Sequence, residues 1–199
     1  MTAPILIFAI GNESRGDDAM APLLLRRLDS WLKTEGRGGD FELIEDFQLQ
    51  VEHAMDMVGR RMVLFIDAGM DTPAPYAFYR ARTSNSHTLY SHALTPEAVL
   101  TVYPQIYQEA PPPAFVLCIR GEQFELGSAL SPAAENRLEV AMDFMQNLLR
   151  KTEVAAWEMQ ASQPALDDAE KHEACAINNL SINNCRCGFI RTERRKTGG

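Results

Sequence analysis

Short apolar runs alternate with helical patterns along the first three-quarters of this 199-residue chain. The runs predict strands at residues 5–10, 41–47, 62–68, 76–82 and 115–120, of which 76–82 is polar enough for the edge of a sheet. Between them, apolar residues at helical spacing predict helices at 19–32, 51–58, 95–107 and from 132 onward. Strands that are apolar throughout are typical of a parallel sheet with helices on both faces. The alternation therefore predicts an α/β domain of three layers, α/β/α.

The regular pattern is lost after Lys151, so we predict one domain over residues 1–151 and a polar tail over residues 152–199. The composition of the tail predicts that it is largely disordered, with a short helix near 153–160. Three of the four cysteines lie in it, so the cysteines form no framework for the core and favour a reducing cytoplasm. These three cysteines and one histidine form the pattern H-x2-C-x9-C-x-C, which is not a usual spacing for zinc ligands. The four residues are His172, Cys175, Cys185 and Cys187.

The overall charge limits the classes of partner. A net charge of −8 argues against nucleic acid and against anionic membranes as binding partners. The apolar start of the chain is short and has no basic residues before it, which predicts a strand and not a signal peptide. No apolar run is long enough to span a bilayer. We therefore expect a cytoplasmic protein that binds neither membrane nor nucleic acid.

The loop after the first predicted strand carries two adjacent acids, Asp17 and Asp18, between Gly11 and Gly16 on one side and a helix on the other. Loops at the carboxyl end of a buried strand are where open α/β sheets place their chemistry. Carboxylates in this position can bind a metal, act as a general base or cap the following helix. The glycine spacing does not fit G-x-G-x-x-G, so a nucleotide site is not favoured.

Two further residues are candidates for the same crevice. Asp67 ends the third apolar run, and His92 precedes the predicted helix that starts at Thr95, with His87 as the alternative histidine. Because the carboxyl ends of the first and third strands of such a sheet converge, we expect Asp18, Asp67 and His92 to lie together. Two carboxylates and one imidazole suit a divalent metal such as nickel or zinc. His53 lies within a predicted helix and is predicted to be on the surface.

Three motifs, in this order, resemble the [NiFe]-hydrogenase maturation endopeptidases. They are Gly11-Asn12-x-x-x-Gly16-Asp17-Asp18, Ile66-Asp67-Ala68 and Ser91-His92-Ala93-Leu94. Residues 48–54 and 120–127 resemble the branch that serves soluble or cytoplasmic hydrogenases, and the resemblance covers residues 4 to 151. It implies a twisted, mostly parallel, mixed five-stranded sheet flanked by helices. It also implies an endopeptidase that removes a C-terminal extension from the hydrogenase large-subunit precursor after nickel has been inserted.

The resemblance assigns roles to individual residues. It implies that Asp18, Asp67 and His92 are the metal-contacting and catalytic positions, with Asp17, Gly11 and Asn12 in support. The hypothesis is that these residues contact nickel already bound in the precursor, so the enzyme itself holds no metal tightly. Two alternatives stay open: a chaperone that checks the precursor for nickel without cutting it, and a metallohydrolase that acts on small substrates.

Overall fold

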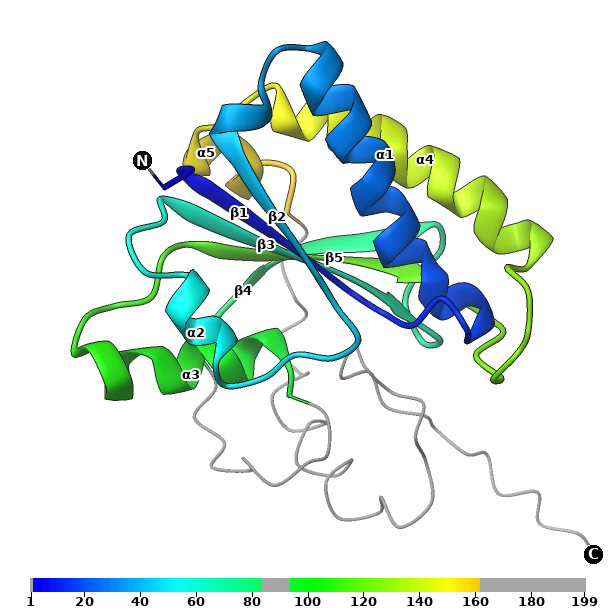
Figure 1. Cartoon of the computed structure of the whole chain (residues 1–199), viewed down its shortest axis with the longest axis horizontal. Helices are drawn as coiled ribbons and strands as arrows, with labels where there is room; N and C mark the ends of the chain where they lie inside the picture. The colour runs from blue at the N-terminus through cyan, green and yellow to red at the C-terminus, as the bar shows by residue number, and fades with distance from the viewer. Residues whose placement is uncertain (1, 84–93, 162–199) are drawn as a thin grey trace, which may run out of the picture.

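A five-stranded sheet forms the centre of the molecule in the computed structural model, which describes residues 2–83 and 94–161 (Figure 1). The strand order is β2-β1-β3-β5-β4, and β4 alone runs antiparallel to its neighbour. The sheet is therefore mixed and mostly parallel, with β4 on an edge, as the sequence predicts. The strands are β1 (Ile5–Ile10), β2 (Phe41–Asp46), β3 (Met62–Gly69), β4 (Tyr76–Ala81) and β5 (Ala114–Arg120).

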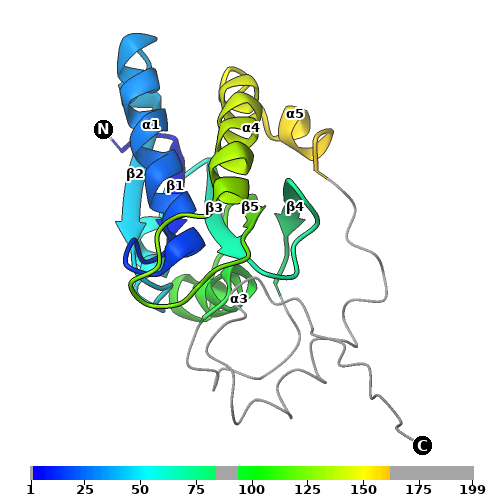
Figure 2. The same cartoon turned by 90° about the vertical axis from the view of Figure 1, so that its right-hand side faces the viewer.

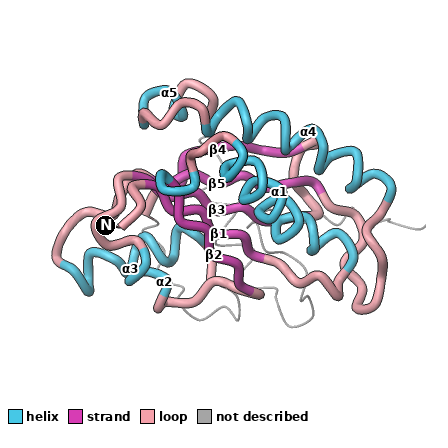
Figure 3. Tube along the Cα trace, turned by 45° about the horizontal axis from the view of Figure 1, so that its top comes forward, coloured by secondary structure: helices cyan, strands magenta, loops and turns pink. Residues whose placement is uncertain are grey.

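Helices cover both faces of the sheet and complete the predicted three layers (Figures 1, 2 and 3). One face carries α1 (Met20–Thr34), α4 (Pro132–Leu149) and the short α5 (Val154–Glu158). The other carries α2 (His53–Asp56) and α3 (Pro96–Tyr107). Two 3-10 turns, η1 (Gly16–Ala19) and η2 (Gly38–Asp40), flank α1. No helix within the described residues combines the length and the apolarity that crossing a membrane requires.

The continuous apolar character of β1 follows from this layering. Because successive side chains of a strand point to opposite faces, Ile5, Ile7 and Ala9 pack into the core beneath α1 and α4. Leu6, Phe8 and Ile10 pack into the second core, beneath α2 and α3. Both sets are buried, so the strand has no solvent-facing positions and shows no polar alternation.

Side-chain caps stabilise the N-terminal ends of two of the long helices, α3 and α4. The Thr95 hydroxyl accepts a hydrogen bond from the Ala98 amide at 3.3 Å at the start of α3. The Ser131 hydroxyl accepts one from the Ala134 amide at 3.1 Å at the start of α4. Each cap is followed by proline at the first helical position, where no amide hydrogen is needed.

The core continues past residue 151. Trp157, on α5, is fully buried, with its ring centroid 5.3 Å from that of Phe115 and 6.3 Å from that of Phe78. Its indole nitrogen donates to the carbonyl of Lys151 at 2.6 Å. The short helix predicted near 153–160 is confirmed, and it belongs to the packed unit. The division at residue 151 itself stays a prediction, and His172, Cys175, Cys185 and Cys187 lie outside the described residues.

We expect Trp157→Ala to lower the free energy of unfolding by about 3–5 kcal/mol, because it leaves a large cavity among aromatic rings. Urea denaturation followed by circular dichroism measures this change. Met159→Ala is the control two residues away, since that side chain is 83% exposed and should matter little. Equal effects of the two substitutions would contradict the packing role of α5.

Candidate functional site

Two glycines allow the loop after β1 to fold back on itself. A Cβ atom at Gly11 would lie 2.1 Å from the backbone oxygen of Asp18, so only glycine permits this contact. Gly16 has a φ of +55°, and a Cβ there would lie 2.6 Å from the backbone oxygen of Gln123. The loop therefore stays close to the carboxyl ends of the parallel strands, which we call the carboxyl edge.

Asp18 is buried in this loop, at 1% exposure. One of its carboxylate oxygens accepts the Asn12 amide hydrogen at 2.9 Å, and the Asn12 side chain in turn accepts the Ser14 amide hydrogen at 2.9 Å. Gly11 and Asn12, the residues expected to support the site, thus both contact Asp18. Their functional role stays a prediction.

Asp17 has a different environment from its neighbour. It is fully buried, and its carboxylate accepts four hydrogen bonds from three residues of another segment. The donors are the Glu122 amide at 2.8 Å, the Gln123 amide at 3.1 Å, and the Ser131 amide at 2.8 Å and hydroxyl at 3.0 Å. Because Ser131 also caps α4, Asp17 links the loop after β1 to the segment 121–131 and to the start of that helix.

Asp67 lies at the carboxyl edge on the neighbouring strand. In the register of β1 and β3, Ala9 pairs with Ile66, so Asp67 follows at the level where β1 ends. Its side chain is half-buried, and one carboxylate oxygen accepts the Ala68 amide hydrogen at 2.7 Å. The turn η1, which carries Asp18, contacts β3. The first loop and the end of β3 are therefore neighbours, as expected from the sequence.

The third predicted metal ligand is the histidine before α3. His92 and its alternative His87 both lie outside the described residues. Within the described residues, no group of three or more histidine, cysteine, aspartate or glutamate side chains is placed to hold a metal ion. The metal-contacting role of Asp18, Asp67 and His92 stays a prediction.

The sequence did not single out Tyr79, whose phenol is influenced by the charge of Asp67. Burial raises the pKa of the Tyr79 phenol well above its ordinary value, and the negative charges of Glu97 and Asp67 raise it further. Tyr79 comes from the edge strand β4, and Glu97 from the first turn of α3. The phenol therefore stays protonated. No local motif marks either residue, because this effect depends on how β4 and α3 pack.

The structure corrects the expectation for His53. The side chain was expected on the surface but is buried, at 8% exposure. Its Nδ1 accepts the Gln50 amide hydrogen at 2.9 Å, its Nε2 lies 3.3 Å from the Asp46 carboxylate, and its ring meets that of Phe8 edge-on. The reason is the position of His53 at the start of a four-residue helix, which turns this residue toward the sheet.

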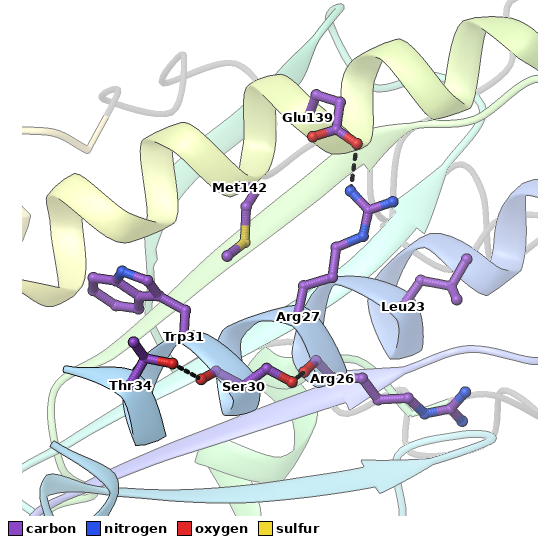
Figure 4. A pocket seen from close by; sticks show the side chains of 8 residues that line it. All are labelled: Leu23, Arg26, Arg27, Ser30, Trp31, Thr34, Glu139 and Met142. Atoms are coloured by element: carbon purple, nitrogen blue, oxygen red, sulfur yellow. Dashed lines mark hydrogen bonds and ion pairs between the residues drawn. The ribbon is translucent and has the colours of Figure 1, made fainter. Parts of the chain in front are cut away.

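A groove between α1 and α4 lies on the outer side of the helices (Figure 4). Its walls include the apolar side chains of Leu23, Trp31 and Met142. The two cations in it are paired already: Arg27 with Glu139 at 2.5 Å, and Arg26 with Glu45 at 2.8 Å. The groove is therefore a poor site for an anion, and the carboxyl edge is the better candidate for chemistry.

We expect Asp17→Asn to lower the free energy of unfolding by about 2–4 kcal/mol, because an amide cannot accept all four hydrogen bonds and its own donors would face amide hydrogens. Urea denaturation gives the value. Asp71→Asn, at an exposed carboxylate, is the matched control and should change stability by less than about 0.5 kcal/mol. If Asp17→Asn is as mild as the control, the linking role of Asp17 is wrong.

The chain is similar in structure to several solved hydrogenase maturation proteases. The [NiFe] hydrogenase maturation protease HycI from Thermococcus kodakarensis KOD1 matches with a TM-score of 0.54 and 22% identity, over 75% of this chain and 94% of that one. The hydrogenase maturating endopeptidase HybD from E. coli matches with a TM-score of 0.55 and 20% identity, over 73% and 91%. No protein-family model and no curated protein sequence matches this chain. The chain therefore has the fold of the hydrogenase maturation proteases.

Proposed function

We propose that this protein is an endopeptidase that removes the C-terminal extension from a nickel-loaded [NiFe]-hydrogenase large-subunit precursor. The observation that carries the proposal is the position of Asp18 and Asp67 at the ends of two adjacent parallel strands in a fold shared with maturation proteases. The motifs around these residues independently resemble those proteases. The cytoplasm, where the precursor would be assembled, is the proposed location.

The donor set fits nickel that arrives with the substrate. Asp18 and Asp67 offer carboxylate oxygens and His92 an imidazole nitrogen, a combination that divalent nickel accepts. Contact with the nickel of the precursor would make cleavage conditional on nickel loading. It would also position the scissile peptide bond beside the carboxylates, which is a proximity effect. Water would then attack the scissile carbonyl carbon, activated by a carboxylate of this set as general base or by the nickel of the precursor; the C–N bond breaks and the leaving amine takes up the proton.

The surrounding residues have supporting tasks in this proposal. Asp17 fixes the loop that carries Asp18, through its four hydrogen bonds to the segment 121–131. The phenol of Tyr79, kept protonated by burial and by the charges of Glu97 and Asp67, adds no further negative charge to the region of Asp67. Neither task requires a metal ion bound by this chain alone.

We expect Asp67→Asn, Asp18→Asn and His92→Ala each to slow cleavage of the nickel-loaded precursor by about 10²–10⁴-fold. Asp143→Asn, at an exposed carboxylate on α4, is the control and should cleave at the wild-type rate. The mass of the large subunit before and after mixing reports the cleavage. If both Asp67→Asn and His92→Ala cleave at the normal rate, the site assignment is wrong.

The source of the metal is tested separately. We expect the purified protein to contain far less than one nickel or zinc ion per chain, and nickel-free precursor to stay uncut. Elemental analysis and the mass of the incubated precursor give the two results. Tightly bound stoichiometric metal would favour a metallohydrolase of small substrates instead. Stable binding of nickel-loaded precursor without any loss of mass would favour a chaperone.

A further inference from the structure

Exposed apolar side chains gather in one segment directly after β2. Phe47 is 66% exposed and Met55 62%, and Val51 and Val58 between and after them are exposed as well. These four side chains, which we call the 47–58 face, lie within twelve residues. The other large exposed apolar side chains of the described residues are scattered over different elements: Ile106, Leu126, Val140 and Met159.

Hydrogen bonds and a side-chain contact fix the backbone of the segment that carries the 47–58 face. The Asp46 carboxylate accepts the Phe47 amide hydrogen at 2.6 Å and lies 3.3 Å from Nε2 of His53. The Nδ1 atom of His53 accepts the Gln50 amide hydrogen at 2.9 Å, which closes the turn before α2. Ala54 and Met57, on the inner side of the segment, are fully buried. Exposed apolar side chains on a backbone that is already fixed bind a partner with little loss of backbone entropy.

Asp46 also connects this segment to the loop of the candidate site. The backbone oxygen of Asp46 accepts the amide hydrogen of Gly11 at 3.1 Å. Gly11 begins the loop that carries Asp18, and Phe47 is the residue that follows Asp46. The 47–58 face therefore starts at the carboxyl edge, beside the loop of the proposed catalytic residues.

Acidic residues predominate in the segment that carries this face. Residues 45–58 contain four carboxylates, Glu45, Asp46, Glu52 and Asp56, and neither lysine nor arginine. Glu45 and Asp46 have partners in Arg26 and His53, while Glu52 lies exposed next to the apolar side chains. A complementary surface has an apolar centre and basic side chains at its border.

We propose that the 47–58 face is a docking surface for the polypeptide that this protein cleaves, and that it binds an apolar patch bordered by lysine or arginine. The inference rests on the proposed function. A peptidase that acts on a protein precursor gains affinity from contact area beyond the few residues at the scissile bond, and the exposed apolar side chains that begin beside the site supply such area.

The test measures cleavage kinetics on the nickel-loaded precursor. The double variant Phe47→Ser with Met55→Ser is expected to raise KM at least tenfold while kcat stays within twofold, because docking is lost and the chemistry is not. The matched control is Val140→Ser with Met159→Ser, two exposed apolar residues on α4 and beyond α5, whose KM should stay at the wild-type value. Urea denaturation of both double variants checks that they fold. A KM equal to that of the control would overturn the docking proposal.

A second measurement identifies the occupant and tests the charge. A photo-crosslinking residue in place of Met55 is expected to capture the precursor, through a segment that contains lysine or arginine. Capture of a second copy of this chain, or of its own residues 162–199, would overturn the proposal. Glu52→Lys should raise KM, and an unchanged KM would contradict the charge argument. Failure of the wild-type protein to cut the precursor refutes the proposed function itself, whereas normal cutting by the Phe47 and Met55 variant refutes only the docking surface.

Discussion

The carboxylate of Asp17 accepts four hydrogen bonds in the interior, and the arrangement of the carboxyl edge depends on them. Its donors belong to a segment more than a hundred residues further along the chain. A buried carboxylate is costly unless its oxygens are satisfied, so this set of contacts leaves little freedom to either segment. The backbone reinforces it, since the Asp17 amide donates to the Gln123 oxygen at 2.7 Å. The loop after β1 is thereby fixed against the start of α4, and Asp18 takes its position from that loop.

Most of the fold could be predicted because each element leaves a local signal. The apolar strand β1, the strand β3 that is apolar up to Asp67, the polar edge strand β4 and the caps at Thr95 and Ser131 all correspond to the structure. These signals are local because burial on both faces, edge exposure and capping each act within a few residues. The packing of Trp157 left no such signal, because a five-residue helix around a single tryptophan does not show which aromatic rings on β4 and β5 it will contact.

The candidate site was predictable only in part, for the same reason. The sequence places Asp18 and Asp67 at the ends of adjacent strands, since strand order in an alternating α/β chain brings those ends together. The resemblance implies that Asp18 contacts the metal and that Asp17 supports the loop, but the sequence does not show how Asp17 is held, because that depends on the distant donors at 122–131. Tyr79 could not be found either, because the charges of Asp67 and Glu97 act on it only once β4 turns back antiparallel to β5 and α3 covers the same face. His53 was misplaced because a helix of four residues has no clear outer face.

The contacts of Asp46 and Asp17 connect the proposed docking surface with the proposed catalytic site at one edge of the sheet. Asp46 holds Gly11 through its backbone oxygen and the turn to α2 through its carboxylate. Asp17 holds the far side of the same loop. The loop that carries Asp18 is therefore held by hydrogen bonds on the side of the 47–58 face and on the side of α4. Such a site tolerates substrate binding without losing the position of Asp18, and proximity effects are sensitive to shifts of about 1 Å. This arrangement suits the proposed reaction, in which the geometry of the incoming nickel would decide whether the peptide bond lies within reach.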